Sequence, residues 1–582
     1  MKIVFVKCVF FLFTAGLIFS QSVEREQGLV TAEPFWRQAL GGEVIALPHV
    51  QAQSAVVVLD GGNIRAYSTA GTPMWNYSAR GRISPYVTRS REGTSYFTRT
   101  NGTLIAVNRA GRELWRRDIG QPLCARVVTG WDGRLFVPTS GRILCFTASG
   151  NLLWSKELSV PFLISPVQDR FGGIIFALEN NEVHRIDPFG NINIWALTNT
   201  PAFVVPLDPQ RRDDGSQLTI PAPELQRSGH RIMVIYTNGS IEILGAPAGD
   251  WFISSFSDMR SSILTSLPSR PISAAGMGNN AAVLLDDGKV SMFSIEERSI
   301  IWTGITHIRE MMNLGRSAVL DAQIIFDERG VYVLSINGAT AFTHEGRRLW
   351  FSYLENAAAI PAFGNDGVLY SGGRDWILYA YRIESRVLPQ RNALYGPVPD
   401  GSYGLGRPYA FYELDIPLNE TETISKVEYI GAAVNSGSLG ENEPSWTSFI
   451  LTQAASRGPI QLRINALNIL GKIGSQETIP WLINIYNREN EPSIKSAAVK
   501  AIGDIGVDPE GTALRTFLFA ILQGGIREEQ VLSAIASSTG AICRFSGPPM
   551  SGMGIRILNL LSAASQPSVV RRQAERELAS LR

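Results

Sequence analysis

The chain has 582 residues, 45% of them hydrophobic, and its 53 basic and 52 acidic side chains leave a formal charge of +1. This composition excludes a disordered chain. The near-neutral net charge means that the chain has no overall excess of basic residues with which to bind nucleic acid. We therefore expect a folded protein with a large core and no nucleic-acid partner.

Residues 1–20 have the pattern of a secretory signal. Lys2 and Lys7 charge the start, and the apolar run from Val9 to Phe19 is too short for a good membrane span. Cleavage before Gln21 predicts an extracytoplasmic protein without a further transmembrane segment. We place it in the periplasm, with outer-membrane association or secretion as alternatives, and an uncleaved N-terminal anchor is the alternative to cleavage.

The stretch TNGTLIAVNRAGRELW, residues 100–115, holds a unit that recurs along the chain. An Asn-Gly turn leads into a short strand, and a second turn at Gly111 leads into a strand that contains Trp115. Glycine supplies the positive φ that tight hairpin turns need, and tryptophan offers a large apolar surface with one N–H. The pattern predicts half of a four-stranded antiparallel sheet.

Tryptophans mark the successive copies of this unit. The first four steps between them are 39, 40, 39 and 41 residues long, and the next three are 56, 51 and 48. A period near 40 with several short strands is typical of a β-propeller, and the longer steps indicate insertions. The tryptophans are Trp36, Trp75, Trp115, Trp154, Trp195, Trp251, Trp302 and Trp350.

The two ends of the repeat region complete each other. Seven hairpins are each followed by a tryptophan strand, whereas an eighth hairpin, Val368–Arg386, has none, and the Trp36 strand has no hairpin before it. Pairing the Trp36 strand with the Val368–Arg386 hairpin closes a ring without a free sheet edge. The sequence therefore predicts an eight-bladed β-propeller over residues 33–386.

The segment AVNRAGRELW, residues 106–115, fits the pattern Ala-x-(Asp/Asn)-x-x-x-Gly-x-x-x-Trp. It resembles the repeat of the pyrroloquinoline-quinone (PQQ)-like propellers, and the resemblance covers residues 33–386. It implies that glycine and tryptophan dock one blade on the next. The residues given this structural role are Trp36, Trp75, Gly111, Trp115, Gly150, Trp154, Gly190, Trp195, Trp302, Gly346 and Trp350.

The propeller is also similar to the propeller lipoproteins of outer-membrane barrel assembly in Gram-negative bacteria. That resemblance implies a binding role without a cofactor. The chain departs from it in two ways, because it has a further C-terminal region and because Cys8 lies inside the signal, too early for a lipid-acceptor cysteine.

The longest insertion, residues 207–230, should lie on the same face of the ring as the glycine turns. Long loops on rigid scaffolds often bind partners, which makes the charged cluster Arg211, Arg212, Asp213 and Asp214 a candidate partner loop. The alternative is an ordinary solvated loop.

Residues 387–420 are rich in Pro, Gly and Tyr and predict a linker that few contacts cross. In residues 421–582 the apolar period becomes helical, and residues 461–474 recur at an offset of 32 as residues 493–506, with Gly474 and Gly506 as expected helix caps. This resembles HEAT-like helical pairs. We expect about four pairs in a short solenoid, with an ordinary helical bundle as the alternative.

Three cysteines remain after the signal. Cys124 is assigned to the innermost strand of its blade and Cys145 to the third, with one strand between them. The two backbones should then be roughly 9–10 Å apart, too far for a disulfide. We expect both to be buried free thiols.

The sequence shows no clear pattern of residues for a catalytic, cofactor-binding or metal-binding site. The five histidines are scattered, and no two cysteines are adjacent as they are in quinone-dependent dehydrogenases. We nominate no catalytic, cofactor-binding or metal-binding residue. The favoured function is an exported, monomeric, non-catalytic scaffold that binds envelope proteins, in cell-envelope assembly. The alternatives are a PQQ-dependent dehydrogenase or a degenerate relative, and an extracytoplasmic ligand or carbohydrate sensor.

Overall fold

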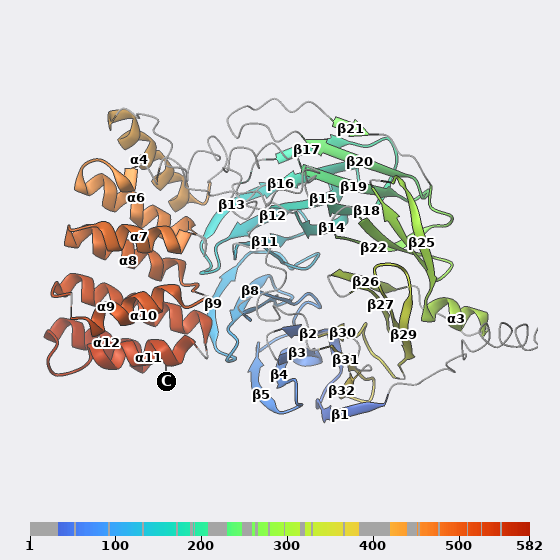
Figure 1. The fold of residues 1–582 in the computed structure, drawn as a ribbon, viewed down its shortest axis with the longest axis horizontal. Coiled ribbons are helices and arrows are strands. Elements are labelled where there is room, and N and C mark those ends of the chain that lie inside the picture. The colour runs from blue at the N-terminus through green and yellow to red at the C-terminus, as the bar shows by residue number, and fades with distance from the viewer. Residues whose placement is uncertain are drawn as a thin grey trace, which may run out of the picture.

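The computed structural model describes residues 33–382 and 420–581, with gaps in both ranges. The gaps longer than four residues are 208–229, 247–258, 315–320 and 439–450. Within these limits the chain forms a ring of β-sheets with an array of helices at its side (Figure 1).

The second blade shows how the repeat folds. Its strands are β6 (Thr88–Arg89), β7 (Ser95–Thr98), β8 (Thr103–Val107) and β9 (Glu113–Asp118), and they are hydrogen-bonded in that order. The middle strands are buried and the outermost strand is largely exposed. Gly111, with φ of 79°, makes the turn between β8 and β9. The four-stranded unit predicted from residues 100–115 is confirmed.

Seven blades are built from consecutive strands, each sheet ordered from the ring's centre outward. Besides the second blade, these are β2 (Val44–Gln51), β3 (Ser54–Leu59), β4 (Asn63–Ser68) and β5 (Pro73–Ser78); β10 (Val128–Thr129), β11 (Leu135–Pro138), β12 (Arg142–Phe146) and β13 (Leu152–Glu157); β14 (Phe162–Gln168), β15 (Ile174–Leu178), β16 (Glu182–Ile186) and β17 (Ile192–Ala196); β18 (Pro201–Leu207), β19 (His230–Tyr236), β20 (Ile241–Ala246) and β21 (Met259–Ser261); β22 (Pro271–Met277), β23 (Asn280–Leu285), β24 (Lys289–Ser294) and β25 (Ser299–Ile305); and β26 (Ala322–Asp327), β27 (Gly330–Ser335), β28 (Gly338–Phe342) and β29 (Arg348–Tyr353).

The eighth blade joins the two ends of the repeat region. It contains β30 (Ala362–Phe363), β31 (Val368–Gly372) and β32 (Ile377–Arg382), and its outermost strand is β1 (Pro34–Ala39). Trp36 of β1 lies opposite Ala380 of β32 in the antiparallel ladder. The predicted eight-bladed ring and its closure by the N-terminal strand are therefore confirmed.

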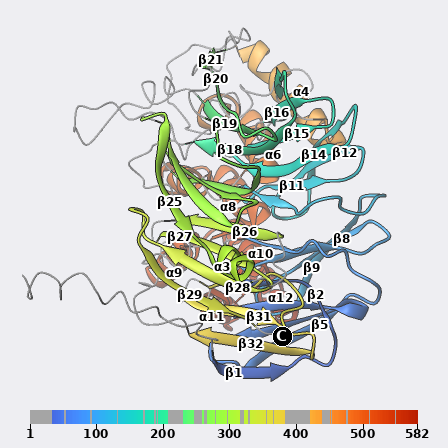
Figure 2. The same cartoon turned by 90° about the vertical axis from the view of Figure 1, so that its right-hand side faces the viewer.

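The fifth blade differs from the prediction. Its outermost strand is β21, which follows Trp251 by several residues, and Trp251 itself lies outside the described residues. The tryptophan spacing misplaced this strand because the blade carries two insertions, 208–229 and 247–258. A short helix, α3 (His307–Asn313), follows the sixth blade and lies against β28 and β29 (Figure 2).

The C-terminal region is a stack of helices in two layers. Within one layer α6, α8, α10 and α12 contact each other in turn, and α7, α9 and α11 contact each other in the second. The helices are α4 (Glu420–Ser436), α6 (Ile460–Ile473), α7 (Ile479–Arg488), α8 (Pro492–Ile505), α9 (Thr512–Leu522), α10 (Glu529–Ser546), α11 (Met550–Leu561) and α12 (Ser568–Leu581). The linker, residues 387–420, lies outside the described residues except for Glu420, so its boundaries stay predictions.

Small residues bring the helices of this stack close together. A methyl group added to Gly471 of α6 would lie 2.8 Å from the Cα of Ala501 in α8. Gly506 ends α8 with φ of 71°, the left-handed cap that the sequence predicts. Gly474 caps α6 as predicted, but in an extended conformation instead of the left-handed one. Its N–H still donates to the carbonyl of Leu470, 2.7 Å away.

The three cysteines in the described residues are free thiols. Strand β11 runs between the segments that hold Cys124 and Cys145, as predicted, since Cys145 on β12 lies opposite Phe136 and the N–H of Cys124 donates to Pro138. Cys145 is buried, but Cys124 is exposed, which contradicts our prediction. The regular inner strand of this blade begins only at Val128, so Cys124 precedes it in an irregular segment.

Candidate functional site

Neighbouring blades meet through tryptophan and glycine. The indole of Trp75 covers Gly111 of the next blade so closely that a methyl group on Gly111 would lie 2.7 Å from the tryptophan. The indole N–H donates to the carbonyl of Arg109, two residues before that glycine, at 2.8 Å. The same glycine contact recurs in the pairs Trp36–Gly71, Trp115–Gly150, Trp154–Gly190 and Trp302–Gly346. We propose that these joints set the angle between blades.

Two nominated tryptophans lack such a glycine contact among the described residues. Trp195 is buried on β17, but the corresponding turn of the next blade falls in the undescribed residues 247–258. Trp350 lies on β29, and the blade after it has no such turn, because its outermost strand comes from the N-terminus. The candidate partner loop, Arg211 to Asp214, also lies outside the described residues, between β18 and β19.

The helical array is joined to the propeller at the ends of its helices. The guanidinium of Arg134, in the turn before β11, donates to the carbonyl of Ile473 at the C-terminus of α6, at 2.8 Å. Arg112 donates to Leu581 at the C-terminus of α12. Helix C-termini carry partial negative charge and unpaired carbonyls, so a cationic donor there satisfies both. We call these contacts, with those of Asn108 below, the propeller–helix junction.

Asn108 serves both the propeller and the junction. Its side-chain oxygen accepts from the N–H groups of Ala110 and Arg112 and so shapes the turn before β9. Its amide N–H donates to the carbonyl of Arg544 near the end of α10, at 2.8 Å. Gly547, which follows α10, packs against Arg109 in the same turn. One turn of the second blade therefore holds the end of α10.

Apolar packing continues across the junction. Buried residues of the third and fourth blades, such as Phe136 and Trp154, belong to one hydrophobic cluster with the buried residues of the helices. Leu152 at the start of β13 also touches Gly437, which follows α4. Hydrogen bonds and apolar packing therefore both cross between the two regions. The junction contacts escaped the sequence analysis because each is made in only one blade.

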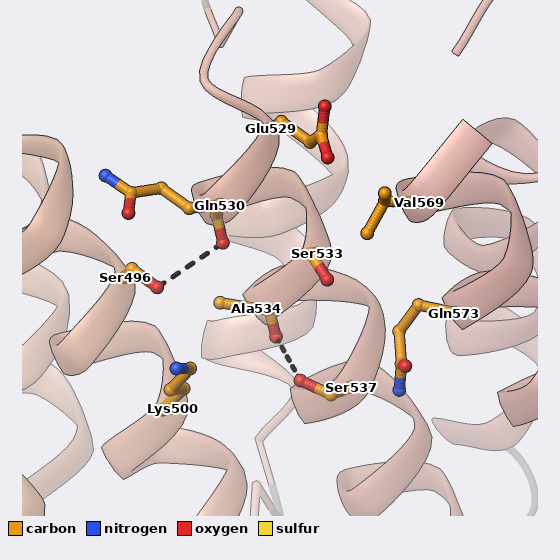
Figure 3. A pocket seen from close by; sticks show the side chains of 9 residues that line it. All are labelled: Ser496, Lys500, Glu529, Gln530, Ser533, Ala534, Ser537, Val569 and Gln573. Carbon is orange, nitrogen blue, oxygen red and sulfur yellow. Dashed lines mark hydrogen bonds between the residues drawn. The ribbon is translucent and has the colours of Figure 1, made fainter. Parts of the chain in front are cut away.

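A shallow groove is lined by side chains of α8, α10 and α12, most of them of polar residues (Figure 3). Its volume is about 500 Å³. The floor has small hydroxyls, and those of Ser496 and Ser537 donate to carbonyls of α10 at 3.3 and 3.0 Å. The residues that line it are Ser496, Lys500, Glu529, Gln530, Ser533, Ala534, Ser537, Val569 and Gln573. Amides and hydroxyls of this kind can pair with a polypeptide backbone.

The near-neutral total charge hides a cationic face on the propeller. Residues 65–142 contain thirteen arginines, no lysine and only four acidic residues. Arg89 and Arg134 are buried, so only some of these arginines add to the surface charge. Arg80 and Arg82 are exposed in the loop between the first two blades. The carbonyl of Arg82 accepts from Thr100, next to Arg99, so these cations share the edge of the ring opposite the turn at Gly111. Counting charges over the whole chain missed this surface.

Some buried polar groups of the ring form hydrogen bonds or ion pairs with other buried side chains. Arg185 and Asp169 form a buried ion pair at 2.6 Å. His307, fully buried, contacts the hydroxyls of Thr340 at 2.8 Å and Ser335 at 2.7 Å. Burial lowers the pKa of His307 to about 3, so the imidazole is neutral at physiological pH. These groups link neighbouring strands and blades.

Two features are absent from the described residues. They contain no group of three or more His, Cys, Asp or Glu side chains placed to hold a metal ion. Within the same described ranges, no helix combines the length and the apolar character needed to cross a bilayer.

Comparison with known proteins matches both regions of the chain. Residues 100–205 match the family model described as outer membrane protein assembly factor BamB. Residues 448–524 match the model for HEAT repeats. The chain is similar to BamB in its propeller and to HEAT-repeat proteins in its helical region. The two resemblances predicted from the sequence are thus confirmed, and no curated protein matches the chain.

Several solved structures are similar to part of the chain. BamB from Moraxella catarrhalis is 14% identical, with 61% of this chain and all of that chain covered and a TM-score of 0.42. The designed protein Ika8 is 13% identical over the same shares, also at 0.42. Sqt1 of Saccharomyces cerevisiae is 10% identical over 62% of this chain and all of that one, at 0.42. At such identities these similarities carry no functional argument.

Proposed function

We propose that this protein is an exported, monomeric and non-catalytic scaffold of the cell envelope that holds two binding surfaces in a fixed relation. The observation that carries the proposal is the propeller–helix junction, because it ties a closed ring to a helical array by hydrogen bonds and shared apolar packing. Binding proteins on rigid scaffolds lose little conformational freedom when a partner docks.

The two surfaces have different chemistry. The groove over α8, α10 and α12 offers hydroxyl and amide groups with Lys500 and Glu529 at its sides, and it would take an extended polypeptide segment. The cationic face around Arg80, Arg82 and Arg99 would take an acidic protein surface. The apolar leader at residues 9–19 and the match to an outer membrane assembly factor support the envelope as the site of action.

Site-specific crosslinking in the native host tests the groove. A photoreactive amino acid replaces Ser533 on the groove, and in a matched control it replaces Asn484, which is exposed on α7 in the other helix layer. We expect a discrete crosslinked envelope protein from position 533 and none from position 484.

Equal crosslinking from both positions, or none from either, would contradict the scaffold. A bound quinone chromophore in the purified protein, together with dye-linked oxidation of an alcohol or a sugar, would favour the dehydrogenase instead. An absorption spectrum recorded after addition of quinone and calcium separates these outcomes.

A further inference from the structure

The second helix layer carries large apolar side chains that face solvent. Phe519 and Leu522 of α9 are 63% and 57% exposed, and Ile555 of the neighbouring helix α11 is 39% exposed. The opposite side of α9 already contributes Leu514 and Phe517 to the core. The exposed side chains are therefore not part of that core, and we call Phe519, Leu522 and Ile555, on two helices in contact, the α9–α11 patch.

Exposed arginines lie on the same two helices as this patch. Arg515 lies one helical turn before Phe519 on the same exposed strip of α9, and Arg556 is the exposed neighbour of Ile555 on α11. Neither α9 nor α11 contains an Asp or a Glu. Apolar side chains beside arginines are the combination by which a protein surface binds the headgroup region of an anionic bilayer.

The charge of the helical region is divided along its length. Residues 420–511 contain seven basic and eleven acidic side chains, whereas residues 512–582 contain eight arginines and four glutamates. The positive half is the one that bears the patch. A two-fold contact between two copies of the chain through this patch would bring arginines against arginines, because a symmetric dimer pairs a surface with itself. The charge pattern thus favours an anionic occupant over a second copy.

We propose that the α9–α11 patch docks the helical array on the surface of a bilayer that contains anionic lipids. Phe519 and Leu522 enter the boundary between headgroups and acyl chains, and Arg515 and Arg556 contact the lipid phosphates. This surface belongs to the helix layer opposite the groove of the proposed function, so membrane docking leaves the groove open to a polypeptide.

Vesicle co-sedimentation tests the proposal with the chain from Gln21 onward, which lacks the apolar leader and keeps every described element. Vesicles of phosphatidylcholine alone are compared with vesicles of equal parts phosphatidylcholine and phosphatidylglycerol. We expect binding to the anionic vesicles, and the double variant Phe519→Ser/Leu522→Ser should lower it by ~10-fold or more. The variant Arg515→Gln/Arg556→Gln should lower it by ~10-fold on anionic vesicles and leave the weak binding to neutral vesicles unchanged.

Leu314→Ser is the matched control, because Leu314 is 53% exposed but lies on the propeller, after α3. An equal loss of binding in this control would overturn the proposal, as would a wild-type chain that binds neither kind of vesicle. A chain that ignores vesicles but binds a soluble acidic protein through Phe519 and Arg515 would also overturn it and assign the patch to a protein partner. Crosslinking at Ser533 reports on the other helix layer, so failure here and failure of the proposed function are distinguishable.

Discussion

The joints between blades and the junction between propeller and helices solve the same problem by different means. Between blades one tryptophan, one glycine and one backbone carbonyl recur from blade to blade, as in Trp75 and Gly111. At the junction, Arg134, Arg112 and Asn108 each make one contact, and each binds a different helix end. Repeated contacts build a closed ring, whereas single contacts fix a second body to one place on it. The two kinds of joint should therefore fail in different ways.

Removal of residues 33–41 should have the largest effect on the ring. The deletion takes away β1, with Trp36 and the fully buried Leu40, and leaves the last blade with an unpaired edge. We expect a loss on the order of 5 kcal/mol or more in the free energy of unfolding, together with aggregation. Thermal unfolding monitored by circular dichroism measures the loss, and an unchanged midpoint would contradict the closure by β1.

A single methyl group should disrupt one blade joint. Gly111→Ala places a side chain at φ of 79° and within 2.7 Å of Trp75, so strain and overpacking add to about 2–4 kcal/mol of destabilisation. Gly61→Ala is the matched control, because Gly61 has φ of 76° but no atom within 4 Å of the added methyl group. The difference between the two variants in the free energy of unfolding, measured with denaturant, gives the cost of the clash with the tryptophan. Equal losses of stability would show that backbone strain alone causes the destabilisation.

A single truncation should weaken the propeller–helix junction. Arg134→Ala removes a buried charged donor from the C-terminus of α6, and we expect a loss of about 2–3 kcal/mol. Arg112→Ala removes an exposed donor from the end of α12 and should cost less than about 1 kcal/mol. Calorimetry of the two variants ranks the contacts, and the reverse order would mean that burial does not decide their strength.

Acid should destabilise the ring through His307. The folded protein keeps this imidazole neutral down to its lowered pKa of about 3, whereas the unfolded chain binds a proton below about 6.5. The contribution of the neutral His307 to the free energy of unfolding is therefore fully present above pH 6.5. It declines as the pH falls toward 3, and the loss is about 2 kcal/mol at pH 5. His307→Gln should remove this part of the pH dependence between pH 7 and pH 5. An identical pH profile in that variant would assign the acid sensitivity to other groups.

The same contrast explains what could be predicted from the sequence. Periodicity located the ring because Trp36 and the Val368–Arg386 hairpin are the two incomplete copies of a repeated unit. It failed at Trp251, where insertions displace the strand, and at Cys124, where the inner strand is irregular. Periodicity does not reveal the helix contacts of Arg134 and Asn108, because a contact made in one blade leaves no repeated pattern. The cationic face was hidden for another reason, since acidic residues elsewhere cancel its charge in the total.

The most direct test of the fixed junction is to cut the chain beside it. A specific protease site is inserted between residues 390 and 418, the purified protein is cleaved, and the products are separated by size-exclusion chromatography in native buffer. If the propeller–helix junction holds the two regions, the fragments elute together as one particle, and Asn108→Ala/Arg134→Ala releases them. Separate elution of the two wild-type fragments would contradict a scaffold with fixed geometry.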